Sequence, residues 1–358
     1  MKTLTELGWS AWFADQISNA DQSSFTIGRV IHHQRGSYGI QTSETLTTGV
    51  VSGRFQHICL SEEEYPAVGD WVLLRPNIDV GSPSVIERVV TRKSCLIRKS
   101  AGKGSQGQVV AANVDTTWIV SSLNQEFNPR RIERYLTFVR DGGSLPQIVL
   151  TKSDLCSDAS TLIGELQKIA GDAPIFVTSS ITGEGFEALK ETLASGKTMA
   201  IIGSSGVGKS TLVNRLSNQD VTGVSGIREA DHKGRHTTTT RTLHFLPDDL
   251  GMLIDTPGMR EIGLMDAKDG LEATFADIQA LALQCKFNNC THTNEPGCAV
   301  LAALEDGTLD EGRLRSFAKQ KREQQFQERR QDAKVKENSK KRWKRISKTL
   351  RQTKKGDF

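Results

Sequence analysis

The chain has 358 residues, enough for two or three domains that each bury a core of their own. Hydrophobic residues make up 37%, no apolar run approaches the roughly 20 residues of a membrane-spanning helix, and the N-terminal residues do not fit a signal peptide, so we expect a cytoplasmic protein. The net charge of +4 hides a basic tail, with 18 Lys and Arg against 5 Asp and Glu over residues 313–358, on a body of charge −9, which points to nucleic acid ahead of membrane as a partner.

The first part of the chain reads as β-structure. Residues 1–25 are expected to form a short helical or loosely ordered extension. Five short strand-like runs follow from Phe25 to about Val90, separated by Gly, Pro and acidic turns. They predict a closed β-barrel of the oligonucleotide-binding (OB) type, an RNA-binding domain over residues 26–112, although an SH3-like barrel or a meander gives the same periodicity. Residues 98–115 form a basic, glycine-rich connection.

From Thr116 onward, apolar strand-like runs alternate with helix-like segments. Alternation of this kind predicts a mostly parallel sheet covered by helices, with ligands at the carboxyl ends of the strands. We therefore expect an α/β domain over residues 113–268. A helical region over residues 269–325 and a basic tail over 326–358 complete the predicted organisation.

The strongest motif is a phosphate loop. Residues 203–210 read GSSGVGKS, which matches G-x-x-x-x-G-K-S/T between a strand-like and a helix-like run. Glycines let successive N–H groups face phosphate oxygens, and the helix N-terminus adds partial positive charge. Lys209 is expected to reach the β- and γ-phosphates, and the Ser210 hydroxyl to bind Mg²⁺. The predicted contacts are Gly203, Ser204, Ser205, Gly206, Val207, Gly208, Lys209 and Ser210.

The bound base is predicted from residues 151–154, T-K-S-D, which resemble the guanine-reading pattern N-K-x-D of GTPases. The Asp154 carboxylate can accept hydrogen bonds from guanine N1–H and the exocyclic amine, whereas adenine would face it with a lone pair. Lys152 is expected to lie along the base. Thr151 replaces Asn and is expected to remove a side-chain tie between loops. A second base-contacting loop is predicted at Thr178, Ser179 and Ser180.

Two further segments complete the nucleotide site. Asp255 begins a D-T-P-G segment and is expected to hold Mg²⁺ through water, while the Gly258 N–H contacts the γ-phosphate. In the run H-T-T-T-T, Thr238 or Thr239 is favoured as the threonine that closes on Mg²⁺, as switch I does. An exposed strand start is the alternative interpretation of that run.

The catalytic apparatus looks incomplete. Ras-like enzymes place a Gln just after the D-x-x-G glycine to orient the attacking water, but residues 259–261 are M-R-E. Hydrolysis is therefore expected to be slow without a partner. His236 is the predicted water-positioning group, because a neutral imidazole can orient water. A His236 that only packs or hydrogen-bonds locally is the alternative.

The motifs stand in an unusual order, because the base-reading segments precede the phosphate segments. A parallel sheet with neighbouring termini tolerates such a circular permutation. The D-T-P-G segment becomes the last element of the domain and leads directly into the C-terminal region. We hypothesise that the γ-phosphate state is passed mechanically from Asp255–Gly258 to that region.

A cluster of metal-binding side chains follows. The spacing C-x4-C-x-H-x5-C offers three thiolates and one imidazole, the tetrahedral N/S set that Zn²⁺ prefers, with no position left for a catalytic water. A structural zinc is therefore predicted, and three buried cysteines with a surface histidine are the alternative. The predicted ligands are Cys285, Cys290, His292 and Cys298.

Both ends of the chain are predicted to contact RNA. The tail from Arg313 resembles a basic helix that orders on RNA, with Trp343 available for stacking. The barrel and the nearby Arg98, Lys99 and Lys103 would add a second RNA-facing surface, with salt-dependent affinity. A solvated tail that binds nothing is the alternative.

The combination of motifs resembles the RsgA/YjeQ family, the ribosome small-subunit-dependent GTPases. An OB-like barrel, AANVDTTWIVSSL, TKSD, GSSGVGKST, GRHTTTTR, DTPGMRE and the Cys/His cluster follow in one order, from about residue 26 to 320. The resemblance implies GTP hydrolysis stimulated by the 30S subunit, late in its maturation, and one structural zinc with Mg²⁺-bound GTP. It extends the nucleotide contacts to Thr211. We expect a monomer that binds GTP or GDP, 16S rRNA and the 30S subunit, and no membrane.

Two other functions are compatible with these motifs. One is a permuted GTPase that acts on the large ribosomal subunit, against which the barrel and the zinc cluster argue. The other is a GTP-dependent RNA-binding switch with negligible turnover, which the missing Gln makes conceivable.

Overall fold

The first part of the chain forms a closed β-barrel. The structure is a computed structural model that describes residues 2–34, 36–75, 82–99, 107–125, 127–217, 241–256 and 267–330, apart from the Gln22 side chain. The barrel strands are β1 (Thr26–Gln34), β2 (Ser37–Thr42), β3 (Leu46–Val51), β4 (Trp71–Arg75) and β5 (Ser84–Val89). The ring closes in the order β1-β2-β3-β5-β4-β1. The predicted barrel is therefore confirmed, and an open meander is excluded.

Apolar side chains from every barrel strand meet inside it. Val30, Ile40, Val72 and Ile86 are among those that are fully buried. The barrel carries α3 (Gly53–Ile58) and the 3₁₀ turn η1 (Glu62–Glu64) between β3 and β4. A separate hairpin follows, made of β6 (Cys95–Lys99) and β7 (Gly107–Ala112). The sequence analysis treated this part of the chain as a connection and missed the hairpin.

The N-terminal extension packs against the outside of the barrel. It contains α1 (Ala11–Ala14) and α2 (Asn19–Ser24), and Ser18 closes a capping box at the start of α2. Leu7 and Phe13 are buried against Trp71, and the Trp9 ring meets the Trp71 ring edge-on, with centroids 4.8 Å apart. These contacts make the extension part of the folded body.

The second part of the chain forms the predicted α/β layer. Its sheet has the order β10-β9-β8-β11-β13-β12, parallel except for β12, as the pairings require. The strands are β8 (Thr116–Ser122), β9 (Leu145–Thr151), β10 (Ile175–Val177), β11 (Thr198–Gly203), β12 (Thr242–Phe245) and β13 (Met252–Asp255). The 3₁₀ turns η2 (Ser153–Leu155) and η3 (Pro247–Asp249) follow β9 and β12.

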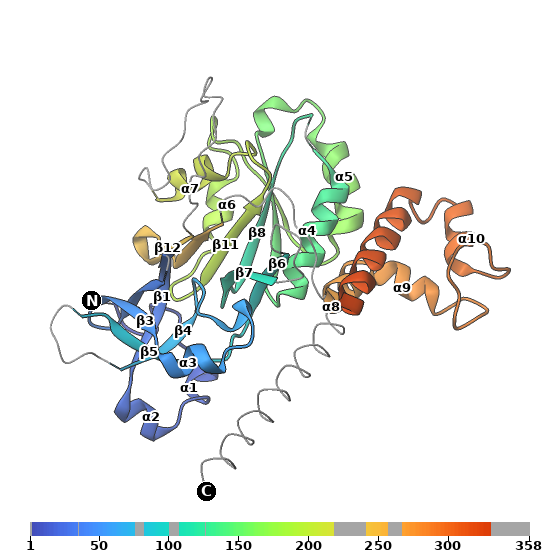
Figure 1. The fold of residues 1–358 in the computed structure, drawn as a ribbon. Helices are drawn as coiled ribbons and strands as arrows, with labels where there is room; N and C mark the ends of the chain where they lie inside the picture. The colour runs from blue at the N-terminus through green and yellow to red at the C-terminus, as the bar shows by residue number, and fades with distance from the viewer. Residues whose placement is uncertain are drawn as a thin grey trace, which may run out of the picture.

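Helices cover both faces of this sheet (Figure 1). They are α4 (Pro129–Asp141), α5 (Ala159–Ala170), α6 (Phe186–Lys190) and α7 (Lys209–Ser217). Successive residues of β8 enter different cores: Ile119 packs with the α4 and α5 side chains, whereas Trp118 packs with those of α6 and α7. A strand buried on both faces explains why β8 reads as a continuous apolar run rather than an alternating one.

The barrel and the α/β layer are joined at β1 and β12. His32 pairs with Thr242, so the two sheets are continuous in hydrogen bonding. Beside this seam, the buried Arg29 guanidinium donates to Leu7 O, Gly69 O, Asn113 O and the Thr198 hydroxyl, and also contacts Met252 Sδ. Burial lowers the pKa of Arg29 to about 10, although Asp115 and Asp70 offset part of that effect. One side chain therefore ties the extension, the barrel, the connection and the sheet together.

The C-terminal part is a helical module beside α4 and α5 (Figure 1). It comprises α8 (Lys268–Thr274), α9 (Ala276–Ala282), α10 (Ala299–Glu305) and a helix over residues 311–330. Leu271, Phe275 and Val300 belong to its core. No helix in the described part of the chain is long and apolar enough to span a bilayer.

Buried ionic groups dock this module on α4. Glu133 is fully buried and accepts from Arg313 at 3.0 Å and Arg130 at 2.8 Å. Arg313 also forms two hydrogen bonds of 2.7 Å with Asp277, inside the module. Because a buried carboxylate is stable only when it is paired, this network fixes where the module sits on α4.

We predict that Arg29→Met destabilises the protein by roughly 3 kcal/mol, because Leu7 O and Asn113 O lose their donor in a buried seam, whereas Gly69 O keeps the Asn113 side-chain amide. Chemical denaturation with a barrel and a sheet probe measures the change. Arg88→Met is the control: Arg88 forms a half-exposed pair with Asp21, and its loss is expected to cost less than about 1 kcal/mol. Equal losses for the two variants would contradict the assignment.

Candidate nucleotide and metal sites

The phosphate loop connects β11 to α7, as the sequence predicts. Gly203 lies against β8, and an added Cβ would come within 2.3 Å of Val120 O. Gly208 has a φ of +95°, which favours glycine, and α7 begins at the next residue. The Lys209 ammonium donates to Gly203 O at 2.8 Å and to Ser204 O at 2.5 Å. The Lys209 side chain thus folds back over the phosphate loop, where it is expected to bind phosphate.

The T-K-S-D segment lies against this loop. Lys152 has a φ of +59°, and its ammonium donates to Gly206 O at 2.7 Å. The Thr151 hydroxyl donates to Val207 O at 2.5 Å. The expectation that Thr151 abolishes a tie between the loops is therefore wrong. The Thr151 hydroxyl, although its side chain is short, ties the two loops together because β9 ends beside the phosphate loop.

The second base-contacting loop holds the carboxylate of Asp154. The Ser179 hydroxyl donates to Asp154 Oδ1 at 2.5 Å and accepts from the N–H groups of Ile181 and Thr182, each at 3.2 Å. Ser180 O accepts from Arg215 on α7, whose guanidinium also lies 4.7 Å from the Phe186 ring centroid. Both base-reading loops are thereby connected to the phosphate-loop unit.

Asp255 ends β13, next to β11 and the phosphate loop. Burial raises the pKa of Asp255, while His244 and Lys209 act in the opposite direction. Because the Lys209 ammonium lowers the pKa of Asp255, the two charged groups interact electrostatically. His236, Thr238 and Gly258 lie outside the described residues, as do the D-T-P-G residues after Thr256.

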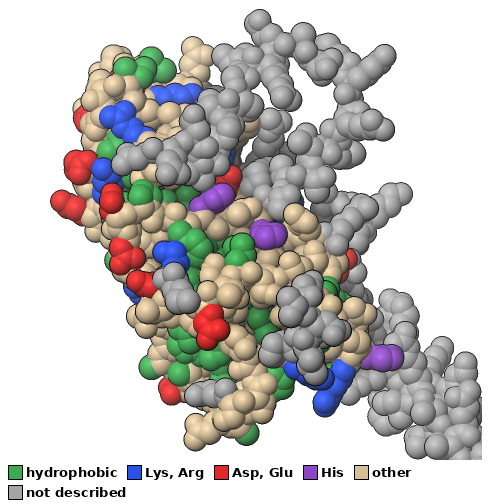
Figure 2. All heavy atoms as spheres, turned by 90° about the vertical axis from the view of Figure 1, so that its left-hand side faces the viewer, with side chains coloured by type: hydrophobic (Ala, Val, Ile, Leu, Met, Phe, Trp, Pro, Cys, Tyr) green, Lys and Arg blue, Asp and Glu red, His purple; other side chains and the backbone are tan. Residues whose placement is uncertain are grey.

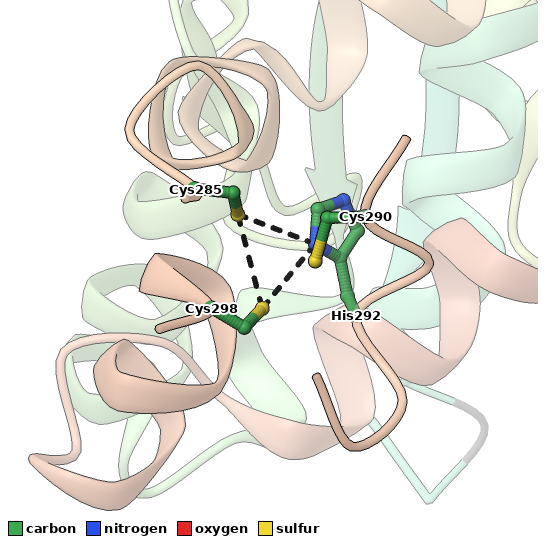
Figure 3. Close-up of side chains that lie close together, drawn as sticks. All are labelled: Cys285, Cys290, His292 and Cys298. Carbon is green, nitrogen blue, oxygen red and sulfur yellow. Dashed lines mark hydrogen bonds between the residues drawn. The ribbon is translucent and has the colours of Figure 1, made fainter. Parts of the chain in front are cut away.

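The Cys/His cluster closes the loop between α9 and α10 (Figure 3). One atom from each of Cys285, Cys290, His292 and Cys298 lies within 4.8 Å of the others. The distances are 3.8 Å from Cys285 Sγ to Cys298 Sγ, and 3.6 and 3.4 Å from these sulfurs to His292 Nδ1. Tetrahedral zinc with ordinary bond lengths separates two sulfurs by about 3.8 Å, and sulfur from nitrogen by about 3.6 Å. The cluster therefore fits one zinc ion.

The surrounding loop favours ligation. His292 adopts a φ of +58°, and the Glu295 carboxylate accepts from the N–H groups of Thr291 and Thr293 on either side of it. Burial and the nearby Lys321 lower the pKa of His292, which favours the neutral imidazole that metals bind. Cys298 caps α10, because its Sγ accepts a hydrogen bond from Leu301 N. The same side chain is therefore both a candidate metal ligand and the N-cap of a helix.

The face of the molecule drawn in Figure 2 shows no continuous basic patch among the described residues. On the face in Figure 2, Lys and Arg side chains are scattered among Asp and Glu. Arg98 is engaged with Gln108 across the β6–β7 hairpin, whereas Lys103 and the tail from residue 331 lie outside the described residues.

Two family models match the chain. The family model described as RsgA GTPase matches residues 89–265. A model described as ABC transporter matches residues 186–356, a span that includes the phosphate loop and its helix, which nucleotide-binding proteins of many kinds share. The curated relatives decide between the two models.

Two curated relatives cover almost the whole chain. Small ribosomal subunit biogenesis GTPase RsgA 2 of Lactiplantibacillus plantarum is 43% identical over 325 residues, 91% of each chain. RsgA 1 of Oceanobacillus iheyensis is 42% identical over 92% of this chain and 93% of its own. Among solved structures, YjeQ from Thermotoga maritima is 29% identical with a TM-score of 0.62, over 84% of this chain and 98% of that one. YloQ, described as a circularly permuted GTPase, is 25% identical with a TM-score of 0.58, over 84% and 96%.

We predict that Thr151→Val weakens GTP binding roughly three- to tenfold, because it keeps the shape of the side chain but leaves Val207 O without its donor. Thr151→Asn is expected to restore the tie. Titration with a fluorescent guanine nucleotide measures both. Thr117→Val, which removes a buried hydroxyl bonded to Ser144, is the control and should leave affinity unchanged.

We predict that Cys290→Ser lowers the zinc content from about one ion per chain to nearly none, because three remaining ligands hold zinc much less tightly. Elemental analysis of protein purified without chelators gives the content. Cys59→Ser, outside the cluster, should keep its zinc. Zinc retained in the Cys290 variant would contradict the ligand assignment.

Proposed function

The chain belongs to the RsgA GTPase family, and we propose that it hydrolyses GTP on the small ribosomal subunit during the late maturation of that subunit. The observation that carries this proposal is the meeting of the T-K-S-D segment with the phosphate loop in permuted order, through Lys152 and Thr151. The names of the relatives favour the small over the large ribosomal subunit, and a GTPase over a switch without turnover.

Guanine recognition rests on Asp154. Its free lone pairs accept from N1–H and from the exocyclic amine, while Ser179 fixes the carboxylate by one short hydrogen bond. Adenine would place an acceptor against the same carboxylate, and an unpaired polar contact in a partly buried site is costly. The Lys152 stem lies along the base, with its ammonium anchored on the phosphate loop. Ser180 lines the same loop.

Phosphate and Mg²⁺ are held by the second half of the permuted domain. Lys209 would neutralise the β- and γ-phosphates, and Ser210, Thr238 and Asp255 would hold Mg²⁺. The N–H groups of the phosphate loop through Thr211, and that of Gly258, complete the contacts. Mg²⁺ bound here neutralises charge that develops on the phosphates.

Water activation is assigned to His236, on the segment that corresponds to switch I. No Gln directly follows the D-T-P-G segment, where residues 259–261 are M-R-E, so the chain on its own has a weak means of orienting water. Docking on the ribosomal subunit would place the imidazole beside the γ-phosphate. Such an enzyme would turn over slowly in solution and faster on its partner.

The remaining modules serve binding. The barrel and the basic tail contact 16S rRNA, largely through phosphates, so affinity falls steeply with salt. Zinc is structural, because four protein ligands fill its tetrahedron and leave no position for substrate. The protein acts as a cytoplasmic monomer. The nucleotide state reaches the zinc-binding module through the chain from Asp255 to α8.

GTP hydrolysis with purified small subunits tests the proposal. We predict slow turnover alone, strong stimulation by small subunits that weakens with salt, and none by large subunits. His236→Ala should abolish the stimulation and leave GTP affinity intact. Stimulation by large subunits alone, or no GTP hydrolysis under any condition, would overturn the proposed function.

A further inference from the structure

One helix contacts both the phosphate loop and the zinc-binding module. α4 lies between the sheet and the C-terminal helices (Figure 1). Arg130 and Arg134 point to the module, where they pair with Asp310 and Glu323. Arg131 and Tyr135, one position further round the helix, point to the phosphate loop instead. Side chains four residues apart lie on one helix face, so each pair forms a separate stripe.

The second stripe converges on one residue of the loop. Arg131 Nη1 donates to the Ser204 hydroxyl at 2.8 Å, and the side chain of the buried Tyr135 hydrogen-bonds to the same hydroxyl. The backbone carbonyl of Ser204 is also one of the two that hold the Lys209 ammonium. Two cations therefore contact Ser204: Arg131 contacts its side chain and Lys209 its backbone carbonyl.

The position of Lys209 tells which part of a nucleotide lies there. In a phosphate loop, the lysine ammonium reaches the β- and γ-phosphates, while the backbone N–H groups cradle the α- and β-phosphates. Ser204 thus marks the end of the site where GTP carries the phosphate that GDP lacks. Arg131 is exposed, and among the described residues no carboxylate pairs with it, unlike its neighbours Arg130 and Arg134.

We propose that Arg131 is a further cation of the nucleotide site, which recognises the terminal phosphate of GTP and is held over the phosphate loop by Ser204 and Tyr135. The inference rests on the proposed function. A guanidinium without a carboxylate partner gains most from the extra negative charge of GTP, so Arg131 favours GTP over GDP. Its hydrogen bond to Ser204 limits the conformational freedom that it loses when the nucleotide binds.

The test compares affinities for GDP and for a non-hydrolysable GTP analogue, by calorimetry with Mg²⁺ present. Arg131→Ala is expected to weaken the GTP analogue roughly five- to tenfold, with GDP changed less than about twofold. Arg131→Lys keeps the positive charge, so its affinity for the GTP analogue should fall less than that of Arg131→Ala. Arg130→Ala is the matched control: it removes the adjacent arginine, which faces the module, and should leave the ratio of the two affinities unchanged.

Thermal unfolding of the nucleotide-free variants establishes that each is folded. An unchanged ratio in Arg131→Ala, equal losses for both nucleotides, or an equal shift of the ratio in Arg130→Ala would overturn this inference. If the natural chain bound neither guanine nucleotide, the proposed function itself would fail. Normal binding by the natural chain with an unaltered Arg131 variant removes only the role of Arg131.

Discussion

The nucleotide site depends on one property of a parallel sheet: every strand delivers the loop after it to the same edge. β9, β11 and β13 run in one direction, so their carboxyl ends lie at the same edge whatever their order along the chain. This is why circular permutation leaves the geometry of the site intact. What permutation changes is the continuation of the chain. After β13 it leads to α8 and the zinc-binding module instead of to another strand of the sheet.

The two junctions of the molecule use buried ionic groups rather than apolar surface alone. Arg29 stands at one of them with backbone carbonyls as partners, and Glu133 at the other with Arg313 and Arg130. Such groups add little net stability, since desolvation offsets most of their attraction. They do penalise every orientation that leaves the charge unpaired. Each junction therefore has a defined geometry, which a purely apolar contact would specify less strictly.

Local patterns were enough to predict the barrel strands, the alternating α/β layer, the phosphate loop and the Cys/His cluster, because each depends on short-range spacing. Thr151 shows where that reasoning failed: its hydroxyl reaches Val207 O only because β9 and β11 are both adjacent to β8. The roles of Arg29 and Arg131 could not be predicted from the sequence, since an arginine in a charged sequence does not reveal its tertiary partners. The β6–β7 hairpin was missed because its glycine-rich connection looks irregular.

The position of α4 bears on how the C-terminal module is attached to the phosphate loop. The chain from β13 to α8 is one connection, and α4 is a second, because it touches Ser204 on one stripe and the module on another. A module held at a single point could rotate freely about it. The ion pairs of α4 with the module restrict such a rotation. Under the proposed coupling, a shift of the phosphate loop would reach the module through α4 as well as through the chain after β13.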